Sequence, residues 1–201
     1  MKRFLPQAGM YLALAGNMVV VLYAMSVYSD LAFWQVSSRF TARISLLIFI
    51  LLFINRLKKL TSFREENWLF GAFAVSHIIH LFFLLYYNSL KGGLHVNVRM
   101  LGGMTGYGLA IVTPLVSLFA SVSQRSIERL RRLTTGVLWL IFLLTYLPRV
   151  TKSDFPAGGT RQEFIAGLAI VAGLGMWQLY VSLITPLKKV KVALNNANLN
   201  Q

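Results

Sequence analysis

Cysteine is absent from this sequence, and acidic residues are scarce. The 201 residues include 20 Lys and Arg but only six Asp and Glu, and three histidines. Without cysteine the chain cannot form a disulfide, a thiolate metal site or a thiol nucleophile. These three kinds of chemistry are therefore excluded from the start.

The six acidic residues lie in or beside short polar strips, and none lies in the middle of a long apolar run. Proton or ion transport needs a chain of ionisable groups inside the membrane, so these positions argue against transport. No serine has both a base and an orienting acid near it, which argues against hydrolase chemistry. The acids are Asp30, Glu65, Glu66, Glu128, Asp154 and Glu163.

Long apolar runs are what the sequence does contain. It is 56% hydrophobic with a mean hydropathy of +0.62, and its polar residues gather in strips between the runs. This pattern is typical of a helical membrane protein. A helix rises about 1.5 Å per residue, so a span needs roughly 17 to 25 residues. Six segments meet this requirement: 7–28, 36–55, 68–88, 101–123, 133–150 and 164–187.

The sequence therefore predicts an all-α, polytopic membrane protein with a bundle of six transmembrane helices in one domain, residues 1–187. All connections are short, so sequential helices should be antiparallel neighbours. We expect the first span to be retained, because no small-x-small cleavage site stands out before Asp30. Residues 188–201 are basic and then polar, and we expect a cytoplasmic tail with a disordered end.

Most of the basic residues fall on one side of the predicted membrane. By the positive-inside rule both termini should be cytoplasmic, as in an integral protein of a bacterial inner membrane. The formal net charge of +14 then reflects topology and attraction to anionic lipid headgroups, and we expect no nucleic-acid partner. The residues on that side are Lys2, Arg3, Arg56, Lys58, Lys59, Arg64, Arg125, Arg129, Arg131, Arg132, Lys188, Lys189 and Lys191.

The strip SQRSIERLRRLTTG before the fifth span is the densest of these basic clusters. It carries Arg125, Arg129, Arg131 and Arg132. One interpretation is a topology anchor that holds lipid headgroups. Another is a docking surface for an acidic partner protein or for the phosphates of a cofactor.

The stretch AFAVSHIIHLFF places His77 and His80 three residues apart in the third span. They share one helix face, about 4.5 Å apart along the axis, so they cannot both be trans ligands of one heme iron. We weigh three roles: interhelical hydrogen bonding, ligation of a single b-type heme by one of them, and a proton relay. A second axial ligand would have to come from elsewhere. The only other histidine is His95 in a loop, and Met104 and Met176 lie in spans four and six.

Three stretches resemble the ferric-reductase-like transmembrane family, and within it the heme-binding membrane subunits of bacterial periplasmic methionine sulfoxide reductase. RFTARISLLIFILLFINRLKKL resembles the second span and NWLFGAFAVSHIIHLFF the third. LFASVSQRSIERLRRLTTGVLWLIFLLTYL resembles the fourth loop and the fifth span. The resemblance covers roughly residues 35–150 and implies six spans with both termini inside.

The resemblance also implies where heme would be bound. Members that hold heme use a third-span histidine, which maps to His80 or His77, and two fifth-span histidines about four turns apart. Here those two positions fall near Thr134 or Thr135 and near Leu147 or Pro148. The resemblance thus implies the fold and one candidate ligand.

Two functions remain open. The first is a non-catalytic subunit without a cofactor, inactive as an enzyme by itself, that packs against other membrane proteins in a larger complex, for instance a redox complex. The alternative is an electron-transfer subunit that keeps one heme b on His80 or His77.

Overall fold

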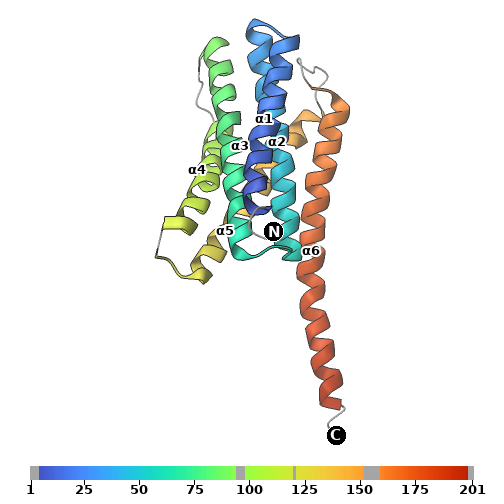
Figure 1. Ribbon diagram of the computed structural model, residues 1–201. Coiled ribbons are helices and arrows are strands. Elements are labelled where there is room, and N and C mark those ends of the chain that lie inside the picture. Colours follow the sequence, from blue (N-terminus) through green and yellow to red (C-terminus); the bar gives the residue numbers. More distant parts are fainter. Residues whose placement is uncertain (1–4, 94–97, 120, 152–158, 199–201) are drawn as a thin grey trace.

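The computed structural model describes residues 5–93, 98–119, 121–151 and 159–198, and in these ranges the chain is helical without strands (Figure 1). A single 3₁₀ turn, η1, follows the fifth helix. The elements are α1 (Leu5–Val27), α2 (Asp30–Lys58), α3 (Phe63–Leu90), α4 (Val98–Phe119), α5 (Gln124–Tyr146), η1 (Leu147–Arg149) and α6 (Arg161–Asn198).

All six α-helices contain a stretch that is long and apolar enough to cross a membrane. This confirms the predicted fold class as an all-α chain with six candidate spans. The helices begin earlier than the apolar runs on which the predicted ranges rest; α2, for example, starts at Asp30 rather than at 36. The stretches are Gly9–Val27, Asp30–Lys58, Phe63–Leu90, Gly102–Phe119, Gln124–Arg149 and Arg161–Ile184.

The turn between α2 and α3 is specified locally. Lys59 adopts a left-handed conformation at φ 50° and ends α2. Ser62 then begins α3 with a capping box: its hydroxyl accepts a hydrogen bond from the Glu65 amide, and the Glu65 carboxylate accepts one from the Ser62 amide. The short turn makes α2 and α3 antiparallel neighbours.

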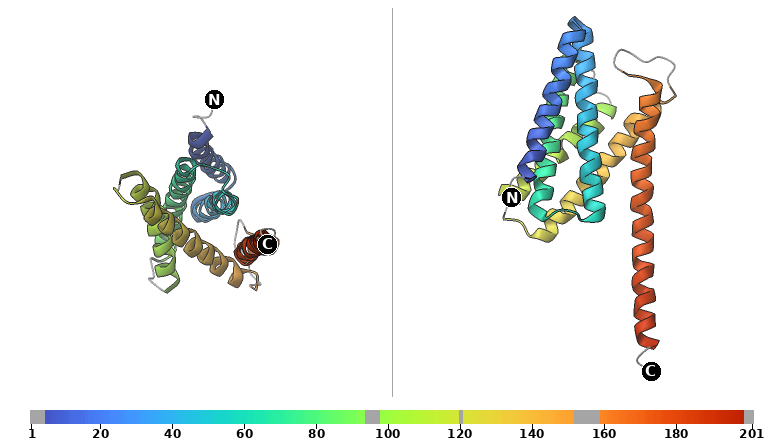
Figure 2. Two further views of the ribbon diagram at one scale, coloured as in Figure 1. Left: turned by 90° about the horizontal axis from the view of Figure 1, so that it is seen from below. Right: turned by 45° about the vertical axis from the view of Figure 1, so that its right-hand side comes forward.

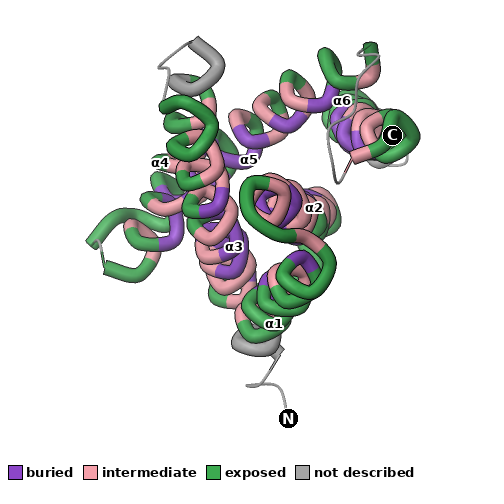
Figure 3. The backbone as a smooth tube through the Cα atoms, turned by 90° about the horizontal axis from the view of Figure 1, so that it is seen from above, coloured by how far each residue is buried: buried purple, intermediate pink, exposed green. Residues whose placement is uncertain are grey.

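The helices α2 and α3 form the centre of the bundle. Helix α1 packs against both, and α4 packs against the other side of α3 (Figures 1 and 3). Helix α5 runs obliquely from α4 to α6, and α6 packs against α5 and α2 (Figure 2). The core holds Phe49, Phe53, Phe73, Leu138 and Phe142.

Polar groups pair inside the bundle while large apolar side chains lie outside. Asn17 of α1 donates to the Ser76 hydroxyl of α3 at 2.9 Å, and Ser76 in turn contacts Ser45 of α2 at 3.0 Å. Leu47 and Met176, by contrast, are 56% and 66% exposed. Interhelical polar contacts with an apolar exterior are the arrangement that suits lipid.

Helix α6 continues well beyond the rest of the bundle (Figures 1 and 2). It ends at Asn198, within the segment 188–201 for which we expect a cytoplasmic tail. The helix continues this far because Leu187–Asn198 contains no glycine or proline and several good helix formers. The end of α6 and the start of α1 lie toward the same end of the bundle, together with the α2–α3 and α4–α5 turns (Figure 1).

Candidate functional site

His80 bonds to the neighbouring helix α2. Its Nδ1 lies 2.8 Å from the Ser38 carbonyl oxygen and 3.5 Å from the Thr41 hydroxyl oxygen. A carbonyl only accepts hydrogen bonds, so a neutral His80 carries its proton on Nδ1 and leaves a lone pair on Nε2. This contact is an interhelical hydrogen bond of the kind that the sequence predicts for the two histidines.

His77 is held differently. Its ring stacks on Phe73 with centroids 4.7 Å apart and contacts the Tyr107 ring of α4 at 4.5 Å. The side chain is buried, and its Nδ1 has no hydrogen-bond partner in the described part of the chain. The predicted hydrogen bond is therefore found for His80, whereas ring contacts surround His77.

Aromatic rings fill the space between these histidines and helices α2 and α5. Phe142 of α5 packs on Phe49 of α2 at 4.9 Å, and Phe49 lies 6.0 Å from Phe73. Together with His77 and Tyr107 these rings form what we call the aromatic core: Phe49, Phe73, His77, Tyr107 and Phe142. Sequence-based reasoning missed Tyr107. The one signal for it in the sequence is that it is the single aromatic residue in the run of small residues GGMTGYGLA.

His77 is buried in the bundle, and the two methionines considered as second axial ligands are exposed. The described ranges contain no group of three His, Cys, Asp or Glu residues placed to hold a metal. Met104 and Met176, the alternative axial ligands, are 55% and 66% exposed on the outside of the bundle. His95 lies outside the described residues.

Thr134 and Thr135, to which the resemblance maps the first fifth-span histidine, lie in close polar packing. The hydroxyls of Thr134 and Thr113 lie 2.6 Å apart between α5 and α4, and both side chains are fully buried. Thr135 donates to the Arg131 carbonyl one turn earlier. The Thr113–Thr134 contact joins α4 and α5 directly.

A buried ion-pair network ties together the bundle end that holds the α2–α3 and α4–α5 turns. Glu66 of α3 accepts from Arg56 of α2 at 2.6 Å and from Arg131 of α5 at 2.9 Å, and Arg56 also binds Glu128 at 2.8 Å. The Arg131 side chain is fully buried, and its guanidinium lies 3.7 Å from the centre of the Phe63 ring. Sequence-based reasoning missed this network, although arginine and glutamate at the ends of successive helices are a usable signal.

The four arginines of the basic strip therefore divide into two kinds. Arg125, Arg129 and Arg132 are exposed, whereas Arg131 points inward and its guanidinium is engaged by Glu66. Arg131 is thus not accessible to a lipid headgroup or a partner protein. The expected contact with lipid headgroups or with a partner therefore concerns only the other three arginines.

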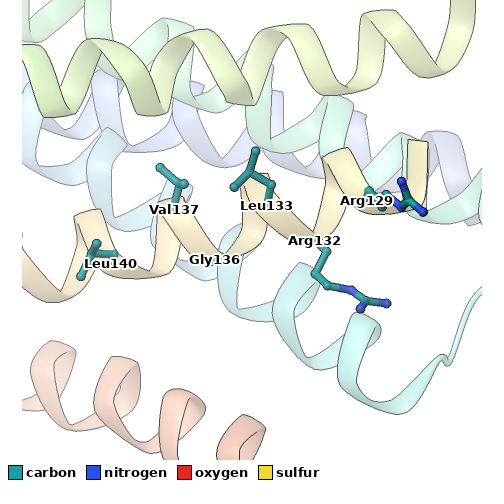
Figure 4. A pocket seen from close by; sticks show the side chains of 6 residues that line it. All are labelled: Arg129, Arg132, Leu133, Gly136, Val137 and Leu140. Atoms are coloured by element: carbon teal, nitrogen blue, oxygen red, sulfur yellow. The ribbon is translucent and has the colours of Figure 1, made fainter. Parts of the chain in front are cut away.

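A shallow groove of about 440 Å³ runs along the outer face of α5 (Figure 4). Two arginines lie at its end nearer the start of α5, and apolar side chains line the rest. The lining residues are Arg129, Arg132, Leu133, Gly136, Val137 and Leu140.

Comparisons with protein-family models, with curated proteins and with solved structures find no match for this chain. The geometry of the bundle is therefore the basis on which a function can be proposed.

Proposed function

We propose that this chain is a non-catalytic integral membrane subunit, of ferric-reductase-like fold, that assembles with other membrane proteins into a larger complex. The observation that supports this most is the aromatic core. In heme-binding members of that family the ligands come from the third and fifth spans, and here rings of α2, α3, α4 and α5 pack against one another around His77. Phe142 lies 4.9 Å from Phe49, and His77 lies 4.5 Å from Tyr107.

A bundle with this interior acts through its outer surfaces. Helix α6 extends past the other helices (Figure 1), and its exposed apolar side chains before residue 185, such as Met176 and Leu179, offer a surface for a neighbouring subunit. The ion-pair network around Glu66 holds α2, α3 and α5 in a fixed arrangement at the basic end.

The orientation belongs to the same proposal. The turn that carries Lys59 and the start of α5, which carries Arg125, lie at one end of the bundle with the start of α1, so these basic strips share that end (Figure 1). We propose that this end is cytoplasmic in a bacterial inner membrane. Reporter fusions after Lys59 and Arg132 should then report the cytoplasm, and fusions after Gly93 and Gly158 the opposite side. The reverse pattern, or termini on different sides, would contradict the proposed orientation.

The assembly role is tested by purification of the tagged chain from its native membrane in a mild detergent. We expect at least one other membrane protein at a constant molar ratio to the chain, and no such protein with an unrelated tagged six-helix protein as control. A homogeneous particle that contains only the chain of 22.6 kDa and lipid would contradict the proposal.

One observation favours the alternative, a heme b subunit. The bond from His80 Nδ1 to the Ser38 carbonyl leaves Nε2 unprotonated, and backbone carbonyls orient metal-binding histidines in this way. The second axial ligand would be an unconventional one of this chain or would be supplied by a partner. Titration of the purified complex with hemin, with His80→Leu as control, separates the two functions. Saturable binding at one site that is lost in the variant would establish the alternative.

A further inference from the structure

The groove on α5 is charged at one end of its length and apolar at the other. Its lining residues follow the spacing i, i+3, i+4, i+7, i+8 and i+11, which places them in one stripe on a single helix face (Figure 4). Arg129 and Arg132 form the charged end, and Leu133 to Leu140 form the apolar end. Such a stripe matches a ligand with an anionic head and an apolar tail.

The stripe is accessible. Leu133 is 58% exposed and Leu140 is 46% exposed. Gly136 lies in the middle of the stripe, and a Cβ added there would meet nothing within 4 Å. The opposite face of α5 is the one that packs into the bundle, through Leu138 and Phe142. The stripe therefore faces the surroundings of the bundle.

The charge at the head of the stripe is not neutralised within the described part of the chain. Neither Arg129 nor Arg132 forms an ion pair there, and the neighbouring Glu128 is engaged by Arg56 at 2.8 Å. No acidic residue lines the groove. Two adjacent guanidinium groups suit a phosphate, which each can bind with parallel hydrogen bonds.

The dimensions fit one leaflet of a bilayer. Arg132 to Leu140 spans eight residues, which is about 12 Å of helix. This is less than half of a hydrocarbon core of about 30 Å. The charged end lies where α5 passes from polar to apolar sequence, so a phosphate at headgroup depth would be level with the two arginines.

We propose that this α5 stripe is a binding site for one acidic phospholipid. The phosphate lies between Arg129 and Arg132, and an acyl chain follows Leu133, Gly136, Val137 and Leu140. A lipid with net negative charge is preferred over a zwitterionic one, because the amine of the latter offsets its own phosphate beside two cations. This site is independent of whether the bundle acts as an assembly subunit or as a heme carrier.

The test is a lipid titration of the purified full-length chain in detergent, followed by native mass spectrometry. The probes are phosphatidylglycerol and phosphatidylcholine. We expect one tightly bound phosphatidylglycerol, weakened about fivefold by Arg129→Gln or Arg132→Gln alone and about 25-fold by both together. Arg125→Gln is the matched control, an exposed arginine outside the groove, and should leave affinity nearly unchanged.

A second variant tests the tail. Gly136→Leu adds a side chain in the middle of the stripe, where a Cβ would meet nothing within 4 Å, and should weaken phosphatidylglycerol binding while the unfolding midpoint stays the same or rises slightly. Equal affinity for the two lipids, or equal loss of affinity from Arg125→Gln and Arg132→Gln, would overturn the proposal. Lipid binding would then depend on the overall positive charge of this end of the bundle and not on a defined site. Unchanged lipid binding in the Arg129→Gln/Arg132→Gln variant, with loss of a copurifying protein, would assign the stripe to an acidic protein partner instead.

Discussion

The substitution Glu66→Gln probes the buried ion-pair network while it preserves side-chain volume. In the folded chain the Glu66 carboxylate accepts from Arg56 at 2.6 Å and from Arg131 at 2.9 Å. The side chains are 11% exposed for Glu66 and Arg56 and 0% for Arg131. The amide cannot balance either cation, so the buried Arg131 guanidinium keeps its charge without its counterion.

Removal of one partner from a buried ion pair typically costs about 3–5 kcal/mol. We expect the lower end, about 3 kcal/mol, because the neighbours compensate in part. Arg131 keeps hydrogen bonds to the Phe63 carbonyl and the Asn67 side chain, and Arg56 keeps Glu128. Glu128→Gln is the matched control: its side chain is 43% exposed, so it should cost only about 0–1 kcal/mol.

The assay is reversible unfolding of the purified chain in mixed micelles, with sodium dodecyl sulfate as denaturant and far-ultraviolet circular dichroism as readout. The double variant Glu66→Gln/Arg131→Met should recover part of the loss, because it removes the uncompensated buried charge as well. If Glu66→Gln and Glu128→Gln unfold at the same detergent fraction, the network does not stabilise the fold as described.

Two smaller perturbations test the histidine site and the α5–α6 contact. His80→Leu removes one interhelical hydrogen bond and should lower the unfolding free energy by about 0.6 kcal/mol in the same assay, and a loss several times larger would contradict this assignment. Gly175→Ala places a Cβ against the Trp139 ring and should cost about 1–3 kcal/mol, whereas Gly173→Ala has open space and should be neutral or slightly stabilising. Equal effects of the two alanines would show that α6 does not pack on Trp139.

The number and type of the helices follow from hydropathy, because length and apolar content alone separate six spans. Helix ends are less predictable. Helix α2 begins at Asp30, several residues before its apolar run, and α6 continues through a basic and polar segment to Asn198. Hydropathy reports where lipid would lie, whereas a helix continues wherever the backbone can bond along its own axis.

The candidate site depends on tertiary packing that the sequence does not reveal. Arg131 belongs to an apparently uniform basic strip, yet it is the one whose partner, Glu66, lies 65 residues earlier on another helix. Tyr107 contacts His77 only because α4 packs beside α3. Periodicity predicts which residues share a helix face, but the helix that meets this face is decided by the fold.

The central claim is that this bundle is an assembly subunit whose interior is filled by its own aromatic rings. The most direct test is the absorbance spectrum of the complex as isolated from its native membrane, oxidised and then reduced with dithionite. The account predicts no heme bands from this chain. A Soret band with sharp reduced α and β bands that disappears in the His80→Leu variant would contradict it.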